Sequence, residues 1–203
     1  MSGQTHLYNC RSMVQDLTTQ HLVERARHGS REAFQALYET YAPRIHNFLY
    51  RLTGSAEESE DLTQQTFLNA LRQLGSLRDT GQLESWLYRI ARNEVYQQFR
   101  KKKPESLDED DKDGIGGRLE EPRLHGNPER LALNRELARE IQGALDSLPL
   151  KLREVFVLAV VHELSYRQIS DIVGRSLLSV KTDIYRARNA VKERLSRYVA
   201  QVS

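Results

Sequence analysis

The sequence predicts an all-α protein made of two small helical domains joined by a flexible linker, with a helix-turn-helix in the second domain. Three observations lead to this prediction. Apolar residues recur at helical spacing through most of the chain, and no segment alternates as a strand does. Residues 106–125 are rich in carboxylates and glycines and hold almost nothing that builds a core. Helical spacing then resumes where Asn127 precedes Pro128, a cap followed by proline at the first helical position.

The predicted organisation has four parts. An N-terminal extension covers residues 1–16, the first domain 17–103, the acidic and glycine-containing linker 104–126, and the second domain 127–203. A chain of 203 residues is long enough for two small domains.

Turn residues divide the first domain into helices. The first apolar run, residues 22–41, is broken at Gly29, and a second helix over residues 45–52 ends at Gly54. The next helix continues to residue 71 and begins with the capping-box pattern of Ser55 and Glu58. A loop over residues 75–83 leads into a last helix at about 84–102.

The second domain ends in the helix-turn-helix. After a helix over about 152–161, Ser165 and Gln168 form another capping box, and Gly174 supplies a turn. The helix after Gly174 has apolar residues three or four apart, which we expect to face inward: Val180, Ile184, Ala187 and Val191. Its outward positions carry mainly basic and hydroxyl groups: Lys181, Thr182, Tyr185, Arg186 and Arg188.

Two short helices with such an outer face suit the major groove of duplex DNA. Arg186 can donate two hydrogen bonds to a guanine edge, and Lys181 can contact a base or a phosphate. The free amides at the Ser165 helix start can hold a backbone phosphate. The alternative is an ordinary helical hairpin with a solvated basic face.

A second candidate nucleic-acid surface lies in residues 85–100. This segment holds the only tryptophan, Trp86, together with two tyrosines, a phenylalanine, three arginines and an asparagine. Aromatic rings beside cationic and amide groups suit unstacked bases, and Leu87, Ile90 and Val95 would form the buried stripe. The alternative is that Trp86 and Tyr88 anchor the core.

Composition argues against several other classes of protein. The net charge is only +2, so local clusters must account for any binding of nucleic acid. The single Cys10 makes neither an internal disulfide nor a zinc site. Because no apolar run approaches a membrane span and no signal peptide is evident, we expect a cytoplasmic protein. The carboxylates near Asp61 lack a histidine, a cysteine or a phosphate loop, so we expect no enzyme, metal, cofactor or small-molecule substrate.

Several segments together resemble the extracytoplasmic-function sigma factors of the sigma-70 family. Residues 61–68 resemble the family's polymerase-binding helix, and residues 85–93 resemble the helix that melts and reads the promoter's minus-ten element. Residues 148–156, 164–169 and 180–188 resemble the minus-thirty-five domain.

The resemblance implies a role for particular residues and partners. It assigns contact with the polymerase to Asp61, Leu62, Gln64, Gln65 and Leu68. It assigns the minus-ten element to Arg78, Trp86, Arg89, Asn93, Tyr96 and Gln97, with the loop over residues 77–83 holding a flipped base. It assigns the minus-thirty-five element to Ser165, Tyr166, Lys181, Thr182, Tyr185 and Arg186. The implied partners are core RNA polymerase, promoter DNA and an anti-sigma factor, which in many members is membrane-anchored and would hold the chain at the inner membrane.

The sequence departs from the family pattern at four places. Gln65 stands where the family generally has glutamate, Leu77 where phenylalanine is common, and Leu178-Ser179 where a glycine–threonine pair is common. Asp183 falls where a basic residue is frequent. Its carboxylate either accepts from a cytosine amino group or pairs with a neighbouring arginine, and pairing is favoured because phosphates repel it.

A one-component repressor is the main rival interpretation. It would use the same helix-turn-helix and take the N-terminal helices as a dimerisation or sensing domain. A repressor should be a dimer that binds duplex DNA alone, whereas a sigma factor should be a monomer when free.

Overall fold

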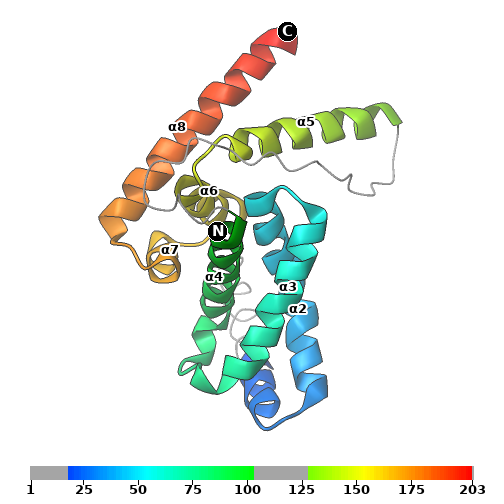
Figure 1. Ribbon diagram of the computed structural model, residues 1–203, viewed down its shortest axis with the longest axis vertical. Coiled ribbons are helices and arrows are strands. Elements are labelled where there is room, and N and C mark those ends of the chain that lie inside the picture. Colours follow the sequence, from blue (N-terminus) through cyan, green and yellow to red (C-terminus); the bar gives the residue numbers. More distant parts are fainter. Residues whose placement is uncertain (1–17, 103–127, 203) are drawn as a thin grey trace, which may run out of the picture.

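The computed structural model describes residues 18–102 and 128–202, and the side chains of residues 18–102 and 136–196. These residues form helices and turns and contain no strand, which confirms the predicted all-α fold (Figure 1). The predicted extension over residues 1–16 and linker over residues 104–126 lie outside the described residues, and the exact domain boundaries stay predictions.

The first region is a helical bundle. It contains a helix over residues 18–27, α2 (Arg31–Thr53), α3 (Ala56–Gln73) and α4 (Leu83–Lys102). The helices α2, α3 and α4 pack side by side in Figure 1 and meet in a common core. The fully or nearly fully buried apolar side chains of this core include Val23, Leu37, Phe48, Leu49, Leu52, Phe67, Leu87 and Val95.

Helix α2 is longer than the sequence pattern predicted. The expected separate helices up to Tyr41 and from Ile45 are one continuous helix that contains Pro43. Proline removes one backbone hydrogen bond from a helix interior. The flanking Ala42 and Ile45 are both buried, so tertiary packing holds the helix together across the missing bond. The predicted break at Gly29, just before the cap residue Ser30, and the predicted end at Gly54 are correct, and Gly54 is in the left-handed conformation at φ +69°.

Helix α3 begins at the predicted cap, but only half of the capping box forms. The Ser55 hydroxyl accepts from the Glu58 amide, as expected. The Glu58 carboxylate instead accepts from Gln98 Nε2 at 2.9 Å and from Lys102 Nζ at 2.6 Å, both on α4. This carboxylate therefore ties α3 to the end of α4.

The predicted loop before α4 contains two short 3-10 turns, η1 (Leu74–Ser76) and η2 (Thr80–Gln82). Leu77 and Leu83 anchor the loop in the core. The guanidinium of Arg27 donates to the carbonyl oxygens of Leu74 and Leu77, which fixes the loop against the first helix.

The second region contains α5 (Pro128–Asp146), α6 (Leu150–Phe156), α7 (Tyr166–Val173) and α8 (Leu177–Val202). Helix α6 continues into one π-helical turn, η3 (Val157–Val161), where the predicted helix over 152–161 was expected to be regular. In Figure 1, α5 and α8 project away from the first bundle and diverge.

The predicted helix-turn-helix is formed by α7 and α8. The capping box of Ser165 and Gln168 is complete, and Gly174 adopts the left-handed conformation at φ +67°. All four apolar positions predicted to face inward from α8 are buried.

The two regions pack against each other through buried polar contacts. Arg92 on α4 pairs with Glu154 on α6 at 2.7 Å, and Arg153 donates to the carbonyl oxygen of Leu52 at 2.6 Å. The Tyr88 hydroxyl lies 2.9 Å from Nδ1 of His162. Helix α4 also contacts α7, so the described parts of the two regions form a closed arrangement.

His162 is held neutral in this interface. Burial lowers the pKa of its imidazole to about 4, and the positive charges of Arg44 and Arg51 add to the effect. In the unfolded chain the same group has its ordinary pKa of 6.5. Between pH 4 and pH 6.5 the unfolded state therefore binds more protons at His162 than the folded state does. The contribution of neutral His162 to stability is complete above pH 6.5 and is lost as the pH falls toward 4.

We expect the His162→Asn variant to lose this pH dependence. In urea titrations, the free energy of unfolding of the unsubstituted chain should fall between pH 6.5 and 5 more steeply than that of the variant, because the pKa difference is worth about 3 kcal/mol in total. His28 is exposed and is the matched control, so His28→Asn should follow the unsubstituted chain. Parallel slopes for His162→Asn and the unsubstituted chain would contradict the assignment.

Candidate nucleic-acid and polymerase interfaces

The outer face of α8 is open to solvent. Lys181, Thr182, Tyr185 and Arg186 are all exposed, Tyr185 to 68%. The buried positions of the same helix hold it against α6 and α7. The four predicted minus-thirty-five side chains on α8 therefore form one continuous surface on the second helix of the helix-turn-helix.

Asp183 belongs to a buried ion network instead of this surface. It is only 5% exposed, and its carboxylate lies 2.6 Å from Nη1 of Arg175. Nη2 of Arg175 lies 2.6 Å from Glu154, whose other carboxylate oxygen pairs with Arg92. Pairing with a neighbouring arginine, which the sequence favoured, is confirmed for Asp183.

Glu154 is the centre of this network and is fully buried. Burial raises the pKa of its carboxyl group, and the guanidinium groups of Arg92 and Arg175 lower it. Each carboxylate oxygen receives one guanidinium, which supplies charge-assisted hydrogen bonds in place of water. The network joins α4, α6, the turn after α7 and α8.

The start of α7 has free backbone donors but no free cap hydroxyl. Ser165 Oγ accepts from the Gln168 amide and donates to Gln168 Oε1 at 2.7 Å. The Ser165 hydroxyl is thus used inside the protein, and the predicted phosphate contact depends on the backbone amides. Amides in the first turn of a helix have no intrahelical partner, so those of Tyr166 and Arg167 are the groups that suit a phosphate.

Only part of the predicted minus-ten set lies on one face of α4. Arg89, Asn93 and Gln97 are exposed and follow one another at four-residue intervals. Trp86 is partly buried and packs against the core, and Tyr88 is fully buried, so the core-anchor alternative holds for Tyr88. Arg78 is exposed on the loop before α4.

Tyr96 lies apart from the exposed stripe of α4. The Arg92 guanidinium stacks over its ring, 4.3 Å from the ring centroid. Burial raises the pKa of the Tyr96 hydroxyl well above its ordinary value, with the Glu154 carboxylate adding to the effect. Tyr96 therefore supports the ion network and is not grouped with Arg89 and Asn93.

Two surface depressions adjoin the α4 stripe. One is lined by Arg89, Arg92 and Asn93 together with residues 171–173 of α7 and the following Gly174, so this face of α4 borders the second region. The other lies between α3 and α4 and is rich in side-chain amides. It adds Asn69 and Gln73 to the predicted Gln65, Asn93 and Gln97. Sequence reasoning missed Asn69 and Gln73, although both lie at helical spacing from Gln65.

The predicted polymerase face of α3 is mostly exposed. Asp61 and Gln64 are exposed, Gln65 is partly exposed, and Leu68 is 50% exposed. Leu62 is 6% exposed and belongs to the core, so it supports this face from beneath. Leu71 is 48% exposed one turn beyond Leu68 and enlarges the apolar part of the face, which the three-residue spacing would have indicated.

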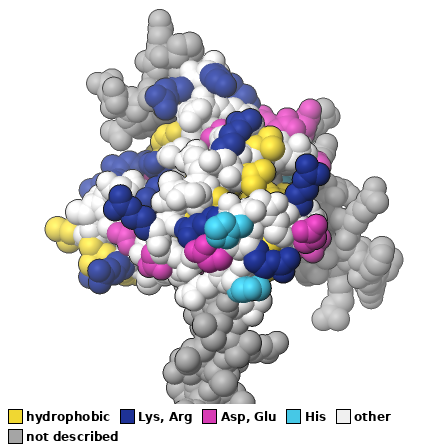
Figure 2. All heavy atoms as spheres, turned by 90° about the horizontal axis from the view of Figure 1, so that it is seen from below, with side chains coloured by type: hydrophobic (Ala, Val, Ile, Leu, Met, Phe, Trp, Pro, Cys, Tyr) yellow, Lys and Arg dark blue, Asp and Glu magenta, His cyan; other side chains and the backbone are white. Residues whose placement is uncertain are grey.

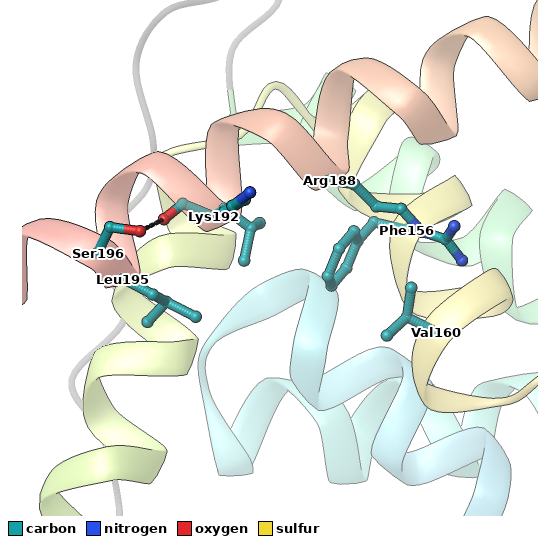
Figure 3. A pocket seen from close by; sticks show the side chains of 7 residues that line it. Phe156, Val160, Arg188, Lys192, Leu195 and Ser196 are labelled. Carbon is teal, nitrogen blue, oxygen red and sulfur yellow. Dashed lines mark hydrogen bonds between the residues drawn. The ribbon is translucent and has the colours of Figure 1, made fainter. Parts of the chain in front are cut away.

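A groove with an apolar floor runs along α8 (Figure 3). Phe156, Val160 and Leu195 point into the space between α8 and the α6–η3 segment, and Arg188 and Lys192 border it from α8. Val160 and Val161 are each 42% exposed. The sequence assigned no function to this groove.

No large surface of one charge is visible on the face drawn in Figure 2, where basic and acidic side chains are interspersed. Among the residues that the structure describes, no His, Cys, Asp and Glu side chains group to hold a metal ion. No helix within the described ranges is long and apolar enough to cross a membrane.

Two family models match this chain. The model for sigma-70 region 2 matches residues 37–105, and the model for sigma-70, region 4 matches residues 138–191. The two matches fall on the α2–α4 bundle and on the α5–α8 region respectively.

Characterised relatives match most of the chain. It is 31% identical over 176 residues to the ECF RNA polymerase sigma factor SigW of Bacillus subtilis, covering 85% of this chain and 94% of that protein. It is 33% identical over 189 residues to the ECF RNA polymerase sigma-E factor of Escherichia coli K12, covering 90% and 97% respectively.

Solved structures have a similar fold. The sigma factor RpoE from Bartonella quintana, in complex with the anti-sigma factor NepR, is 27% identical with a TM-score of 0.63, covering 80% of this chain and 96% of that one. CnrH, in complex with the cytosolic domain of CnrY, is 22% identical with a TM-score of 0.66, covering 89% and 98%, and shows the fold alone.

Replacing Glu154 by glutamine should destabilise the protein strongly. The shape is kept, but two guanidinium groups lose their buried carboxylate, and breaking such a network typically costs about 3–5 kcal/mol. Urea titration at pH 7 measures the loss. Glu60→Gln is the control on an exposed carboxylate and should change the free energy of unfolding by less than about 0.5 kcal/mol. Equal stability of the two variants would show that the ion network contributes little.

Proposed function

This chain belongs to the extracytoplasmic-function sigma factors of the sigma-70 family, and from that premise we propose how its surfaces divide the work of transcription initiation. The chain directs promoter-specific initiation by binding core RNA polymerase and recognising the minus-ten and minus-thirty-five elements. In this proposal, α3 holds the polymerase, α4 and the preceding loop read the minus-ten element, and α7 with α8 reads the minus-thirty-five duplex.

The observation that carries the proposal is the separation of exposed surfaces by type. The α3 face combines Asp61 and Gln64 with the exposed Leu68, a mixed surface that suits a protein partner. The α4 stripe of Arg89, Asn93 and Gln97 offers a guanidinium and two amides, which suit base edges. Since α3 and α4 are packed in one bundle, the polymerase and the melted strand would be held together.

In the proposed minus-ten site, Arg78 reaches the displaced strand from the loop before α4. Trp86, at the first turn of α4 and packed against the core, limits how far the strands can re-pair. Leu77 is buried, so the wall for a flipped base would come from the exposed part of the loop, residues 78–82. The amide-lined depression between α3 and α4 would receive an unstacked base beside Asn93 and Gln97.

Promoter binding in this proposal requires the two regions to separate. The elements lie about 25 positions apart, which is about 85 Å of duplex at about 3.4 Å per base pair. Helices α4 and α7 are in direct contact in the closed arrangement. The interface that must open is rich in polar contacts, and such groups can be rehydrated when the regions part.

The main test combines association and distance. Cys10 is the only cysteine, so a Cys10→Ser chain with Gln35→Cys on α2 and Asn189→Cys on α8, both exposed, takes two fluorophores. We expect the labelled chain to be a monomer with high energy transfer. Addition of core polymerase should form a complex with lower transfer, and that complex should start transcription at mapped sites on genomic fragments.

The same experiment has two informative failures. If the chain does not associate with core polymerase from its own host, the proposed function is wrong, and a dimer that binds duplex alone would favour a repressor. If it associates and initiates without any loss of transfer, the proposed separation of the regions is wrong. Labels at Gln35 and Arg72, both within the first bundle, are the control and should report no change.

We also propose that an anti-sigma factor binds the groove along α8. The apolar floor of Phe156, Val160 and Leu195 suits the apolar side of an amphipathic helix, and Arg188 and Lys192 suit acidic residues along its edges. The similar RpoE structure contains an anti-sigma factor, which supports a partner of this kind. A membrane-anchored partner would keep the chain at the inner membrane and away from the polymerase.

Replacing Val160 by aspartate tests the groove, because it places a carboxylate in its apolar floor. We expect the variant to bind the anti-sigma factor at least tenfold more weakly. The anti-sigma factor is first identified by its effect on transcription, and titration calorimetry then measures the affinity. Val161→Asp is the matched control, since Val161 is equally exposed but does not line the groove. Equal losses for the two variants would place the partner elsewhere.

A further inference from the structure

The first turn of α8 carries an exposed apolar side chain, Leu178, that belongs neither to the ion network nor to the core. Leu178 is 75% exposed, the most of any large apolar residue whose side chain the structure describes. It makes no contribution to the buried face of α8, which is formed by Val180, Ile184 and their successors. Exposed apolar residues are common singly, so Leu178 alone carries no inference.

Leu178 does not stand alone. Thr182 and Tyr185 follow it by four and seven residues, so the three lie on one stripe of the helix, and all are exposed. The Thr182 hydroxyl donates to the Leu178 carbonyl oxygen at 3.0 Å and is thus turned to its own helix. Thr182 therefore presents its methyl group outward, and the stripe is largely apolar.

The stripe is bordered by cations, which suit the phosphates of DNA. Lys181 and Arg186 are exposed beside it on the same helix. Asp183, the one carboxylate in this stretch, is buried against Arg175 and does not reach the surface. On the exposed outer face of the second helix of a helix-turn-helix, a narrow apolar stripe between cations suits the inside of a major groove whose edges carry phosphates.

One chemical group in the major groove is apolar, the C5-methyl group of thymine. We propose that Leu178, with the Thr182 methyl group, selects thymine methyl groups in the minus-thirty-five duplex. This inference rests on the proposed function of α8. Residues at the start of a recognition helix contact base edges, so Leu178 reaches the groove floor at one end of the element. It contributes a preference for A·T pairs at positions that Arg186 does not read.

Deoxyuridine substitution tests this directly, because it removes only the methyl group and leaves base pairing intact. Holoenzyme is assembled from core polymerase and the full chain. It is then bound to duplexes of promoters at which it starts transcription. Each thymine of the minus-thirty-five element, on either strand, is replaced singly. We expect one or two positions to bind about fourfold more weakly, about the value of burying one methyl group.

The Leu178→Ala variant completes the test. At those positions it should bind thymine and deoxyuridine duplexes about equally, because the group that senses the methyl is gone. Leu137→Ala changes another exposed leucine, 47% exposed and on α5, and should keep the full difference. Arg186→Ala should weaken binding to both duplexes while keeping their ratio.

Three results would overturn the inference. They are equal binding of thymine and deoxyuridine duplexes by the unsubstituted holoenzyme, an unchanged ratio in Leu178→Ala, and minus-thirty-five elements without A·T pairs. In each case the holoenzyme still initiates at its promoters, so the proposed function stands. Failure to form a holoenzyme is a different outcome and defeats the proposed function itself.

Discussion

The buried carboxylate of Glu154 is the constraint on which the arrangement of this protein depends. A charge without solvent must be matched by opposite charge, and Glu154 obtains it from Arg92 in the first region and Arg175 in the turn between α7 and α8. The position of the recognition helix relative to α6 is therefore set by an ion network as well as by apolar packing. Arg175 also pairs with Asp183, which keeps this carboxylate away from the exposed face that carries Lys181, Thr182 and Arg186.

The same network divides α4 into two functional faces. Arg92 and Tyr96 turn toward Glu154, whereas Arg89, Asn93 and Gln97 remain exposed, with Arg89 and Asn93 bordering the depression next to α7. The polar contacts between the regions are thus made by groups that water can solvate again, namely guanidinium, carboxylate, hydroxyl and imidazole groups. An interface of this chemistry suits regions that pack together when free and act apart on a promoter.

The exposed surfaces differ in what they offer a partner. The α3 face and the α8 groove combine apolar area with charged edges, and the α4 stripe offers hydrogen-bonding groups to bases. Helix α8 joins cations with an apolar stripe, and in the proposed function these groups suit phosphates, polar base edges and methyl groups. Three different chemistries are thus displayed on the described helices.

The sequence by itself determined the helices, the cap at Ser165, the turn at Gly174 and the inward face of α8, because these depend on neighbours within one or two turns of the chain. It also indicated the exposed stripe of Arg89 and Asn93. Only the tertiary structure decided that α2 continues through Pro43, that Leu62 and Tyr88 are buried, and that Tyr96 lies beside Arg92 and apart from the exposed stripe of α4. The partners that decide these points lie far away in the chain: Glu154 is 62 residues from Arg92, and His162 is 74 residues from Tyr88. Local periodicity carries no information about which distant charge or ring will lie opposite a given side chain.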